Sequence, residues 1–245
     1  PCPADVASAE LARGRRAGAR LLTEGDADWP SLLADLPDAP PLLWARGRVD
    51  LLSRPMVALV GARNASSLGL RMARRLAADL GAAGHVVVSG LARGIDGAAH
   101  EAALPHGTVA VLAGGVDEVY PSENAALAAR IATEGLILSE QPMGLAAQAR
   151  HFPARNRIIS GLSHGVVVVE AGRNSGSLIT ARFAGEQGRD VFAVPGSPTD
   201  PRAAGPNRLI RDGAILCASV DVILDALRVS EQNNHLREGI HHFAI

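Results

Sequence analysis

Short runs of apolar residues recur along the middle of the chain, each stopped by glycine or small residues. The runs are Met56 to Val60, His85 to Val88, Thr108 to Leu112, Leu136 to Leu138, Val166 to Val169 and Val191 to Val194. Runs that are apolar on both faces are typical of buried strands in a parallel sheet. Between the first two, residues Gly69 to Ala83 keep apolar side chains at helical spacing, which predicts an amphipathic helix. Alternating strands and helices predict an α/β fold, an extended Rossmann-like, doubly wound and mostly parallel sheet that binds ligands at its strands' carboxyl ends.

The segments outside this core have weaker patterns. Residues 1–24 are interpreted as a partial N-terminal helical segment. Residues 25–50 carry four prolines, which predict an extended connector rather than a helix. The Rossmann-like domain is expected over residues 51–228, ending in a helix over Val220 to Leu227. Residues 229–245 show no convincing periodicity and stay unassigned.

Composition indicates a folded chain with any positive charge concentrated locally. Of its residues 47% are hydrophobic and 20% are charged, which is typical of globular proteins rather than disordered ones. The net charge of −1 argues against a uniformly basic nucleic-acid binder, so such a function would depend on a local cluster. All 24 basic residues are arginines, whose planar fork pairs with phosphate and stacks on bases. Biased codon usage is the simpler explanation for the absence of lysine, and the chemistry of arginine is available in either case.

The sequence gives no sign of a metal, a disulfide framework or a membrane segment. Cys2 and Cys217 are too few and too far apart for a metal site or a disulfide framework. No apolar run is long enough to span a membrane, and no leader pattern opens the chain. We therefore expect no cofactor, no metal and no membrane partner, and a cytoplasmic location.

A polar, glycine-bounded loop follows the first predicted strand, from Gly61 to Gly69. Such a loop, opening a helix, aims backbone N–H groups and the helix dipole at an anion, and Arg63 is placed to clamp a phosphate. The loop has neither the GxGxxG fingerprint nor a Gly-Lys-Ser/Thr sequence, so standard NAD and ATP sites are disfavoured. The alternative is a plain turn with Ser67 as the helix N-cap.

Two similar loops follow later strands, Ser89 to Asp96 and Glu170 to Ala181. Their glycines and serines permit close approach of a phosphate. Asp96 is expected to cap the helix after it, and His100 to be a structural hydrogen-bonding residue rather than an acid or base. Three such loops at one sheet edge would form a continuous groove that follows a phosphate backbone.

The stretch from Gln141 to Val169 contains arginines and histidines and no acidic residue. Phe152 stands within it, in a chain with only 3% aromatic residues. An aromatic side chain among arginines is the elementary unit of single-strand binding, because it combines base stacking with phosphate neutralisation. The alternative is that Phe152 is a core residue and the arginines pair with distant carboxylates.

These segments, taken together, resemble the DNA-processing protein A (DprA/Smf) family over roughly Trp29 to Leu227. The similar blocks are residues 60–63, 89–96, 152–162, 175–181, 194–196 and 205–214. The resemblance implies a Rossmann-like protein that binds single-stranded DNA without sequence preference. It also implies a non-catalytic role, loading the RecA recombinase during natural transformation.

The resemblance also implies roles for individual residues. Arg63 would clamp backbone phosphate, Phe152 would stack a base, Arg155 and Arg157 would line a positive pocket, and the Ser175–Ser177 loop would donate to phosphate. The implied contacts with single-stranded DNA are Gly61, Arg63, Ser66, Gly69, Gly90, Arg93, Gly94, Arg150, Phe152, Arg155, Asn156, Arg157, Ser175, Gly176 and Ser177.

The resemblance further implies a homodimer, with Leu209, Ile210 and Leu216 as interface residues. Family members often carry an N-terminal helical domain related to sterile-alpha-motif folds and a C-terminal winged helix. Here the first is partial and the second is not recognisable. Ala62 and Leu68 replace a usual serine and tyrosine, which implies a modest loss of affinity.

Two enzyme classes are the alternatives. A phosphoribohydrolase of the lysine-decarboxylase-like group, which cleaves nucleoside monophosphates, has similarly glycine-rich loops. It should carry a Pro-Gly-Gly-x-Gly-Thr loop, whereas the loops here read Ala113-Gly114-Gly115-Val116 and Glu170-Ala171-Gly172. A dinucleotide-dependent oxidoreductase is disfavoured because the fingerprint is missing.

Overall fold

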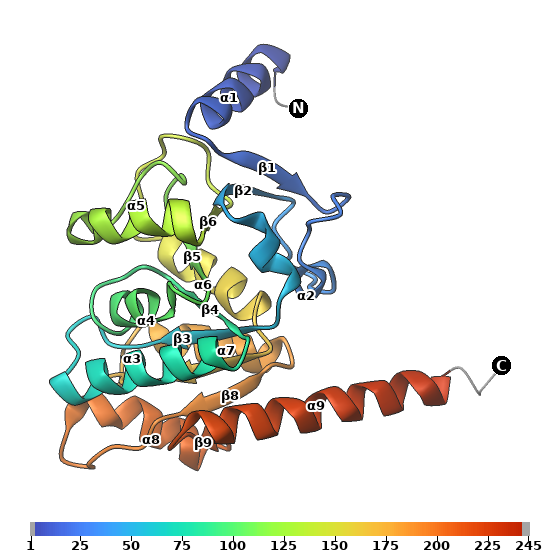
Figure 1. Cartoon of the computed structure of the whole chain (residues 1–245). Helices are drawn as coiled ribbons and strands as arrows, with labels where there is room; N and C mark the ends of the chain where they lie inside the picture. The colour runs from blue at the N-terminus through green and yellow to red at the C-terminus, as the bar shows by residue number, and fades with distance from the viewer. Residues whose placement is uncertain (1–2, 242–245) are drawn as a thin grey trace.

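The computed structural model describes residues 3–241 as alternating strands and helices (Figure 1); of residues 231 and 233–241 it describes the backbone alone. The elements in chain order are α1 Ala4–Arg16, β1 Arg20–Thr23, α2 Ser31–Ala34, β2 Leu42–Gly47, η1 Val49–Ser53, β3 Met56–Val60, α3 Ser67–Ala82, β4 Val86–Ser89, α4 Ile95–Ala103, β5 Thr108–Val111, η2 Ser122–Asn124, α5 Ala125–Glu134, β6 Leu136–Ser139, α6 His151–Gly161, β7 Gly165–Val168, α7 Ser177–Glu186, β8 Asp190–Ala193, η3 Pro201–Ala203, α8 Ala204–Arg211, β9 Ile215–Leu216 and α9 Val220–His241.

One nine-stranded sheet runs through the molecule in the order β1-β2-β6-β5-β4-β3-β7-β8-β9. The strands from β6 to β9 in this order are parallel, while β2 is antiparallel to both β1 and β6. The predicted α/β fold with a Rossmann-like, mostly parallel sheet is confirmed, and the six predicted strands correspond to β3–β8. The chain order reverses between β3 and β7, the point where open α/β sheets bind ligands.

Both faces of the sheet are covered, which explains why its central strands are apolar throughout. Alternate residues of β3 point to opposite faces: Val57 and Leu59 pack with α3 and α4, while Ala58 and Val60 pack with α6 and α7. Helix α9 packs on the same face as α3 and α4 through Ile223. The resulting three-layer arrangement leaves the loops at the strand ends free to form a site.

The N-terminal region differs from its prediction. Residues 25–50 are not a simple extended connector, because strand β2 lies within them and pairs with β6. Residues 1–24 contain the expected helix α1 but also strand β1, which pairs with β2. The prolines between β1 and β2 interrupt the alternation of apolar and polar residues. The pairing of these strands with each other and with β6 is a long-range contact that the local sequence does not indicate.

Three local predictions also need correction. Ser66 rather than Ser67 caps α3, since its Oγ accepts a hydrogen bond from the Gly69 N–H at 2.9 Å. Asp96 lies inside the first turn of α4, and the residue at the cap position is Gly94. The last helix continues past Leu227 to His241, where the sequence showed no periodicity. Cys2 and residues 242–245 lie outside the described residues.

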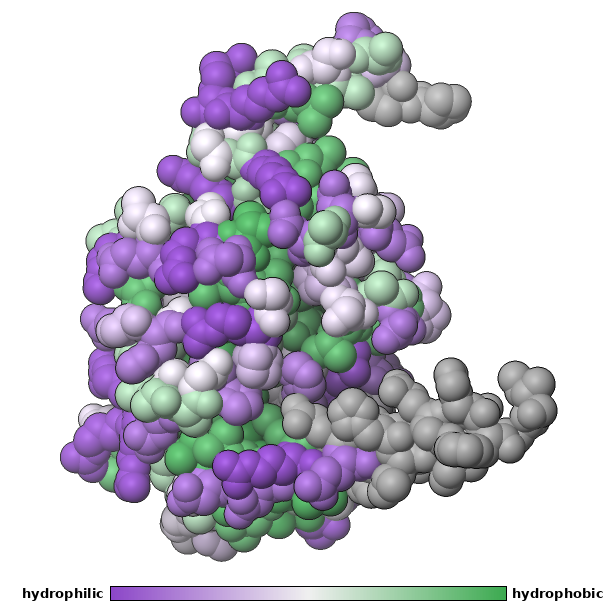
Figure 2. Space-filling view, turned by 45° about the vertical axis from the view of Figure 1, so that its right-hand side comes forward, coloured by the Kyte–Doolittle hydropathy of each residue, from purple (hydrophilic) through white to green (hydrophobic). Residues whose placement is uncertain are grey.

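The surface of residues 3–241 and the buried thiol of Cys217 bear on the expectations from composition. On the face shown in Figure 2, hydrophilic side chains are interspersed with smaller hydrophobic areas. Within the described part of the chain, no helix is long and apolar enough to span a bilayer, and no cluster of His, Cys, Asp or Glu could hold a metal ion. Cys217 is fully buried, and burial raises the pKa of its thiol to about 11.

Candidate functional site

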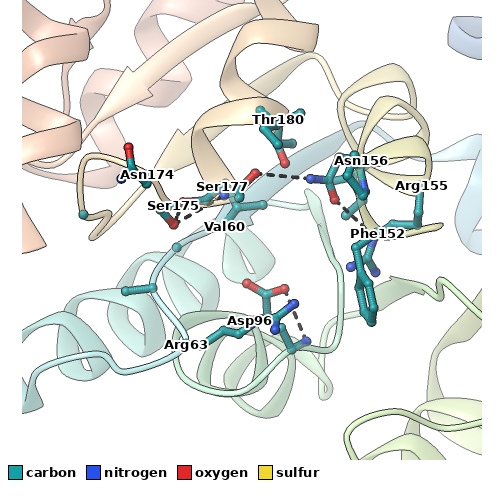
Figure 3. A pocket seen from close by; sticks show the side chains of 18 residues that line it. Val60, Arg63, Asp96, Phe152, Arg155, Asn156, Asn174, Ser175, Ser177 and Thr180 are labelled. Atoms are coloured by element: carbon teal, nitrogen blue, oxygen red, sulfur yellow. Dashed lines mark hydrogen bonds between the residues drawn. The ribbon is translucent and has the colours of Figure 1, made fainter. Parts of the chain in front are cut away.

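The loops after β3, β4 and β7 meet at the carboxyl ends of the parallel strands and enclose a cavity of about 610 Å³ (Figure 3). The cavity lies at the reversal point between β3 and β7. Its lining residues are Val60, Gly61, Ala62, Arg63, Ala92, Asp96, Phe152, Pro153, Arg155, Asn156, Ile159, Gly172, Asn174, Ser175, Gly176, Ser177, Ile179 and Thr180. The structure therefore brings together the three predicted loops and the start of α6.

Glycines let the loops after β3 and β4 pack against each other. Gly94 has φ of +74°, and a Cβ there would collide with the carbonyl oxygen of Ala62. A Cβ on Gly61 would lie 2.6 Å from Cγ1 of Ile95. A side chain at either position would force the loops apart, so these glycines shape the cavity wall.

Glu170 fixes the loop after β3. Its carboxylate accepts hydrogen bonds from the backbone N–H of Ser66 at 2.8 Å and from the Ser66 hydroxyl. The same carboxylate lies where a Cβ of Gly69 would fall. Ser66 thus bonds this loop to the β7–α7 loop, Gly69 leaves room for the Glu170 carboxylate, and a direct contact of either with DNA stays a prediction.

Arg155 and Asp96 form a buried charged floor. The Arg155 side chain donates to the carbonyl oxygens of Gly90, at 2.8 Å, and Val111. Asp96 accepts from the backbone N–H groups of Gly90 and Ala92 at 3.1 and 3.3 Å. Burial lowers the pKa of Arg155 to about 10, against the opposing effect of Asp96, and burial raises the pKa of Asp96. These groups hold the floor rigidly.

Arg63 and Phe152 stand at the mouth of this cavity. The Arg63 Cζ lies 5.3 Å from the centroid of the Phe152 ring, a cation–π distance. Figure 3 shows the Arg63 side chain extending from its loop toward the ring. Arg63 is exposed, and no carboxylate pairs with it among the described residues. An unpaired guanidinium beside a half-buried ring is available for both a phosphate and a base.

The start of α7 provides polar groups on the opposite wall. The hydroxyls of Ser175 and Ser177 lie 2.8 Å apart, and the Asn156 amide donates to the Gly176 carbonyl oxygen at 3.2 Å. Thr180 is only 1% exposed, lines the cavity and turns toward it in Figure 3. The backbone N–H groups of Ser177, Leu178 and Ile179 already donate to Ser175 and Gly176. The hydroxyls of Ser175, Ser177 and Thr180 are therefore the groups of this wall that suit an anion.

Arg157 does not line this cavity, contrary to the prediction. Its guanidinium pairs with Glu140 at 2.7 Å and lies 3.7 Å from Asp38. Two residues along an α-helix rotate the side chain by about 200°, so Arg155 and Arg157 point to opposite sides of α6. The alternative that arginines of this stretch pair with distant carboxylates is therefore right for Arg157.

Two other predicted cations lie at the margins. Arg150 is exposed just before α6, does not line the first cavity, and donates to His151 Nε2 at 3.3 Å. Arg93 pairs with Glu123 at 2.5 Å and lines a second cavity, of about 400 Å³. The local positive charge is thus smaller than the arginine count predicts.

His100 has the structural role expected of it. Its Nδ1 lies 2.7 Å from the Thr108 hydroxyl, which itself donates to the Val87 carbonyl oxygen. Burial, with a contribution from the nearby Arg155, lowers the pKa of His100 to about 3. A neutral, fully buried histidine away from both cavities does not serve as a general acid or base for them.

Comparison with known proteins decides the family. A family model described as DNA recombination-mediator protein A matches residues 20–228. This chain belongs to that family. It is 44% identical over 220 residues to the DNA processing protein DprA of Bacillus subtilis, covering 89% of this chain and 74% of that protein. It is also 44% identical to protein Smf of Synechocystis sp., of which it spans 54%.

Two solved structures of family members are similar to the chain. The X-ray structure of DprA from Streptococcus pneumoniae gives a TM-score of 0.83 at 43% identity, covering 89% of this chain and 77% of the other. DprA from Helicobacter pylori, in a structure described as giving insight into its single-stranded DNA binding mode, gives 0.79 at 31% identity. It covers 86% of this chain and 96% of that one. The suspected DprA/Smf membership is confirmed.

Sequence reasoning missed several lining residues. Asp96, Asn174 and Thr180 line the first cavity, and Asn64 and Tyr120 line the second. Tyr120 is the only tyrosine of the chain and is 51% exposed, so its rarity was a usable signal. The others are small polar residues whose placement depends on how the loops fold.

The residues predicted for a dimer interface lie near the far edge of the sheet. Leu216 is in the edge strand β9 and is 48% exposed. Leu209 packs partly against the core, and Ile210 is half-buried. The interface stays a prediction.

Proposed function

We propose that this chain binds single-stranded DNA without sequence preference along the groove formed by the loops after β3, β4 and β7. The observation that carries the proposal is the unpaired Arg63 guanidinium beside the Phe152 ring at the mouth of the first cavity. Stacking on an aromatic ring accepts any base, and an arginine beside it neutralises the backbone. The family assignment supports the same ligand, as does the single-stranded DNA binding mode described for DprA from Helicobacter pylori.

The chain further acts as a recombination mediator that loads the RecA recombinase onto this strand in natural transformation, and does so in the cytoplasm without catalysis. The description of its family, DNA recombination-mediator protein A, supports the mediator part of this proposal. A homodimer through Leu209, Ile210 and Leu216 would hold two segments of one strand and gain avidity. Of the other predicted contacts, Ser66, Gly69, Gly90, Gly94, Arg155 and Asn156 would shape the groove rather than bind the strand directly, and Arg157 would take no part because it pairs with Glu140.

The alternative of a nucleotide-cleaving phosphoribohydrolase has weaker support. Asp96 is the one carboxylate among the residues that line the first cavity, and its oxygen accepts two backbone hydrogen bonds beside Arg155. A carboxylate bound in this way is poorly placed to act on a substrate. Incubation with nucleoside monophosphates and detection of released base tests this alternative directly.

The test of DNA binding is a fluorescence-anisotropy titration of labelled oligo-dT across a salt series, with duplex DNA for comparison. The variants are Arg63→Ala and Phe152→Ala. Arg182→Ala and Phe183→Ala are matched controls, because the Arg182 Cζ lies 5.4 Å from the Phe183 ring outside both cavities. Loss of a stacked base costs about 1–3 kcal/mol of binding free energy.

We expect tight binding selective for the single strand, weakened by both groove variants and unchanged by both controls. Arg63→Ala should also make the salt dependence shallower, by about 0.7 in the log–log slope for one phosphate contact, whereas Phe152→Ala should not. Equal binding by the groove variants and the wild type would refute the groove assignment. Base release from nucleoside monophosphates would instead favour the enzyme.

A further inference from the structure

We infer that the strand continues past Phe152 into the second cavity, where Tyr120 stacks a further base and Arg93 exchanges Glu123 for a backbone phosphate. This inference depends on the proposed function, since it extends the same groove. It assigns a base-binding role to Tyr120, which the family resemblance did not indicate.

The two cavities adjoin. Arg63, Ala92, Phe152 and Arg155 line both of them, so a ligand that leaves the first cavity past Phe152 enters the second. The second cavity, of about 400 Å³, is further lined by Asn64, Gly90, Arg93, Tyr120 and Pro121. Its walls therefore combine an aromatic ring, a cation and backbone groups, the same kinds of group as in the first.

The Tyr120 ring is placed to receive a second base. It lines the second cavity and is 51% exposed, so part of its ring is open to a ligand. Its centroid lies 5.6 Å from that of Phe152, with the two ring planes inclined at 61°. Rings at this angle cannot sandwich one base between them, so each offers a face to a separate base of the strand. Stacking of this kind is independent of base identity.

The segment that carries Tyr120 is held firmly against the loop after β4. The side-chain amide of Asn124 donates to the carbonyl oxygens of Leu91 and Ala92 at 2.9 and 3.1 Å. These bonds join the segment after Tyr120 to the wall shared by both cavities. The stacking surface is thus pre-positioned, which lowers the entropic cost of holding a base there.

The ion pair between Arg93 and Glu123 can be replaced by a contact between Arg93 and a phosphate. The two side chains are 58% and 56% exposed, and exposed ion pairs contribute little net stability. A phosphate in the second cavity therefore replaces the Glu123 carboxylate at small cost. Glu123 consequently competes with DNA for Arg93, and removing its charge should strengthen binding.

The experiment is an anisotropy titration with labelled oligo-dT from about 4 to about 16 nucleotides, the range of site sizes for single-strand-binding modules. The variants are Tyr120→Ala, Tyr120→Phe and Glu123→Gln, and thermal unfolding checks that each is folded. Glu186→Gln is the matched control for Glu123→Gln, because Glu186 forms an exposed ion pair with Arg182 outside both cavities.

We expect Tyr120→Ala to bind the longer oligonucleotides about tenfold more weakly and the shortest as the wild type does. Tyr120→Phe should retain binding, because the ring is kept. Glu123→Gln should bind the longer oligonucleotides more tightly and with a steeper salt dependence, whereas Glu186→Gln should not.

Three results would overturn the inference. If Phe152→Ala weakens binding but neither Tyr120→Ala nor Glu123→Gln changes it at any length, the proposed function stands and the second subsite does not exist. If Tyr120→Ala weakens binding equally at every length, Tyr120 acts through Phe152 and stacks no base of its own. If the wild type binds no oligonucleotide, the proposed function fails together with the inference.

Discussion

Arg155 and Arg157 are separated by one residue on α6, yet their surroundings are opposite. Arg155 is 6% exposed beneath the first cavity, where it donates to the carbonyl oxygens of Gly90, in the loop after β4, and of Val111, at the end of β5. Arg157 faces away and pairs with Glu140. Arg155 is therefore part of the scaffold, and of the two arginines that line the first cavity the exposed Arg63 is the one available to a ligand.

We predict that Arg155→Ala lowers the free energy of unfolding by about 3–5 kcal/mol. The buried carbonyl oxygens of Gly90 and Val111 lose a charged donor, and the buried Asp96 loses the favourable charge of Arg155, although the two side chains form no ion pair. Denaturant unfolding measures the change. Arg211→Ala is the control, because Arg211 is 75% exposed and its loss should change stability by less than about 0.5 kcal/mol. A loss equal to that of the control would show that the buried arginine is dispensable.

The sequence could not separate these two arginines. A count of charges treats every arginine between Gln141 and Val169 alike. The cation beside Phe152 is instead Arg63, which comes from the loop after β3. Tyr120 was missed for the related reason that a single aromatic residue in a polar segment has no periodicity. Its position opposite Phe152 follows from the meeting of η2 with the loop after β4.

At the scale of elements, the central strands were predictable and the edge strands were not. β3 to β7 are buried along their whole length and β8 in its second half, so their apolar runs are continuous. β1 is four residues long with exposed ends, and β2 follows a row of prolines. Their strand conformation depends on pairing with each other and with β6, which is a long-range contact. Local patterns do not contain that information.

Helix α4 carries a buried histidine that should make stability depend on pH. Burial lowers the folded-state pKa of His100 to about 3, and its Nε2 has no hydrogen-bond partner among the described residues. In the unfolded chain the pKa is near 6.5. Between these values the unfolded state binds one more proton, so stability is fully present above pH 6.5 and falls as the pH drops toward 3.

We predict that this histidine alone removes about 2 kcal/mol of stability between about pH 6.5 and about pH 5. His100→Asn should abolish that part of the pH dependence, whatever its effect on stability at neutral pH. The measurement is denaturant unfolding at several pH values for the wild type and the variant. The exposed His106 provides the control, and His106→Asn should leave the slope unchanged. Parallel curves for the wild type and His100→Asn would contradict the prediction.

At the scale of the whole molecule, the candidate site exists only in the assembled fold. Residues from Val60 to Thr180 line its first cavity, and no single segment contributes more than part of a wall. Its position could be predicted, since parallel strands that reverse order create a crevice at their carboxyl ends. Its division into two cavities could not, because that depends on how the Phe152 and Tyr120 rings lie between the loops.

The edge of the sheet formed by β9 is the candidate surface for dimer formation. Strand β9 is an edge with two paired residues, and Leu216 in it is 48% exposed. Helix α1 lies at the other end of the molecule (Figure 1), where Val6 is 53% exposed. An exposed edge strand with an apolar side chain is a template for pairing with a second copy of the chain.

We predict that Leu216→Glu converts a homodimer into a monomer, because a charge on the edge opposes apolar contact and strand pairing. Analytical ultracentrifugation measures the mass, and Val6→Glu is the control with similar exposure at the far end. The monomer should bind a short oligonucleotide normally and a long one more weakly, since only the long strand engages two subunits at once. A wild type that is monomeric at every concentration would refute the dimer, and a dimeric Leu216→Glu would place its interface elsewhere.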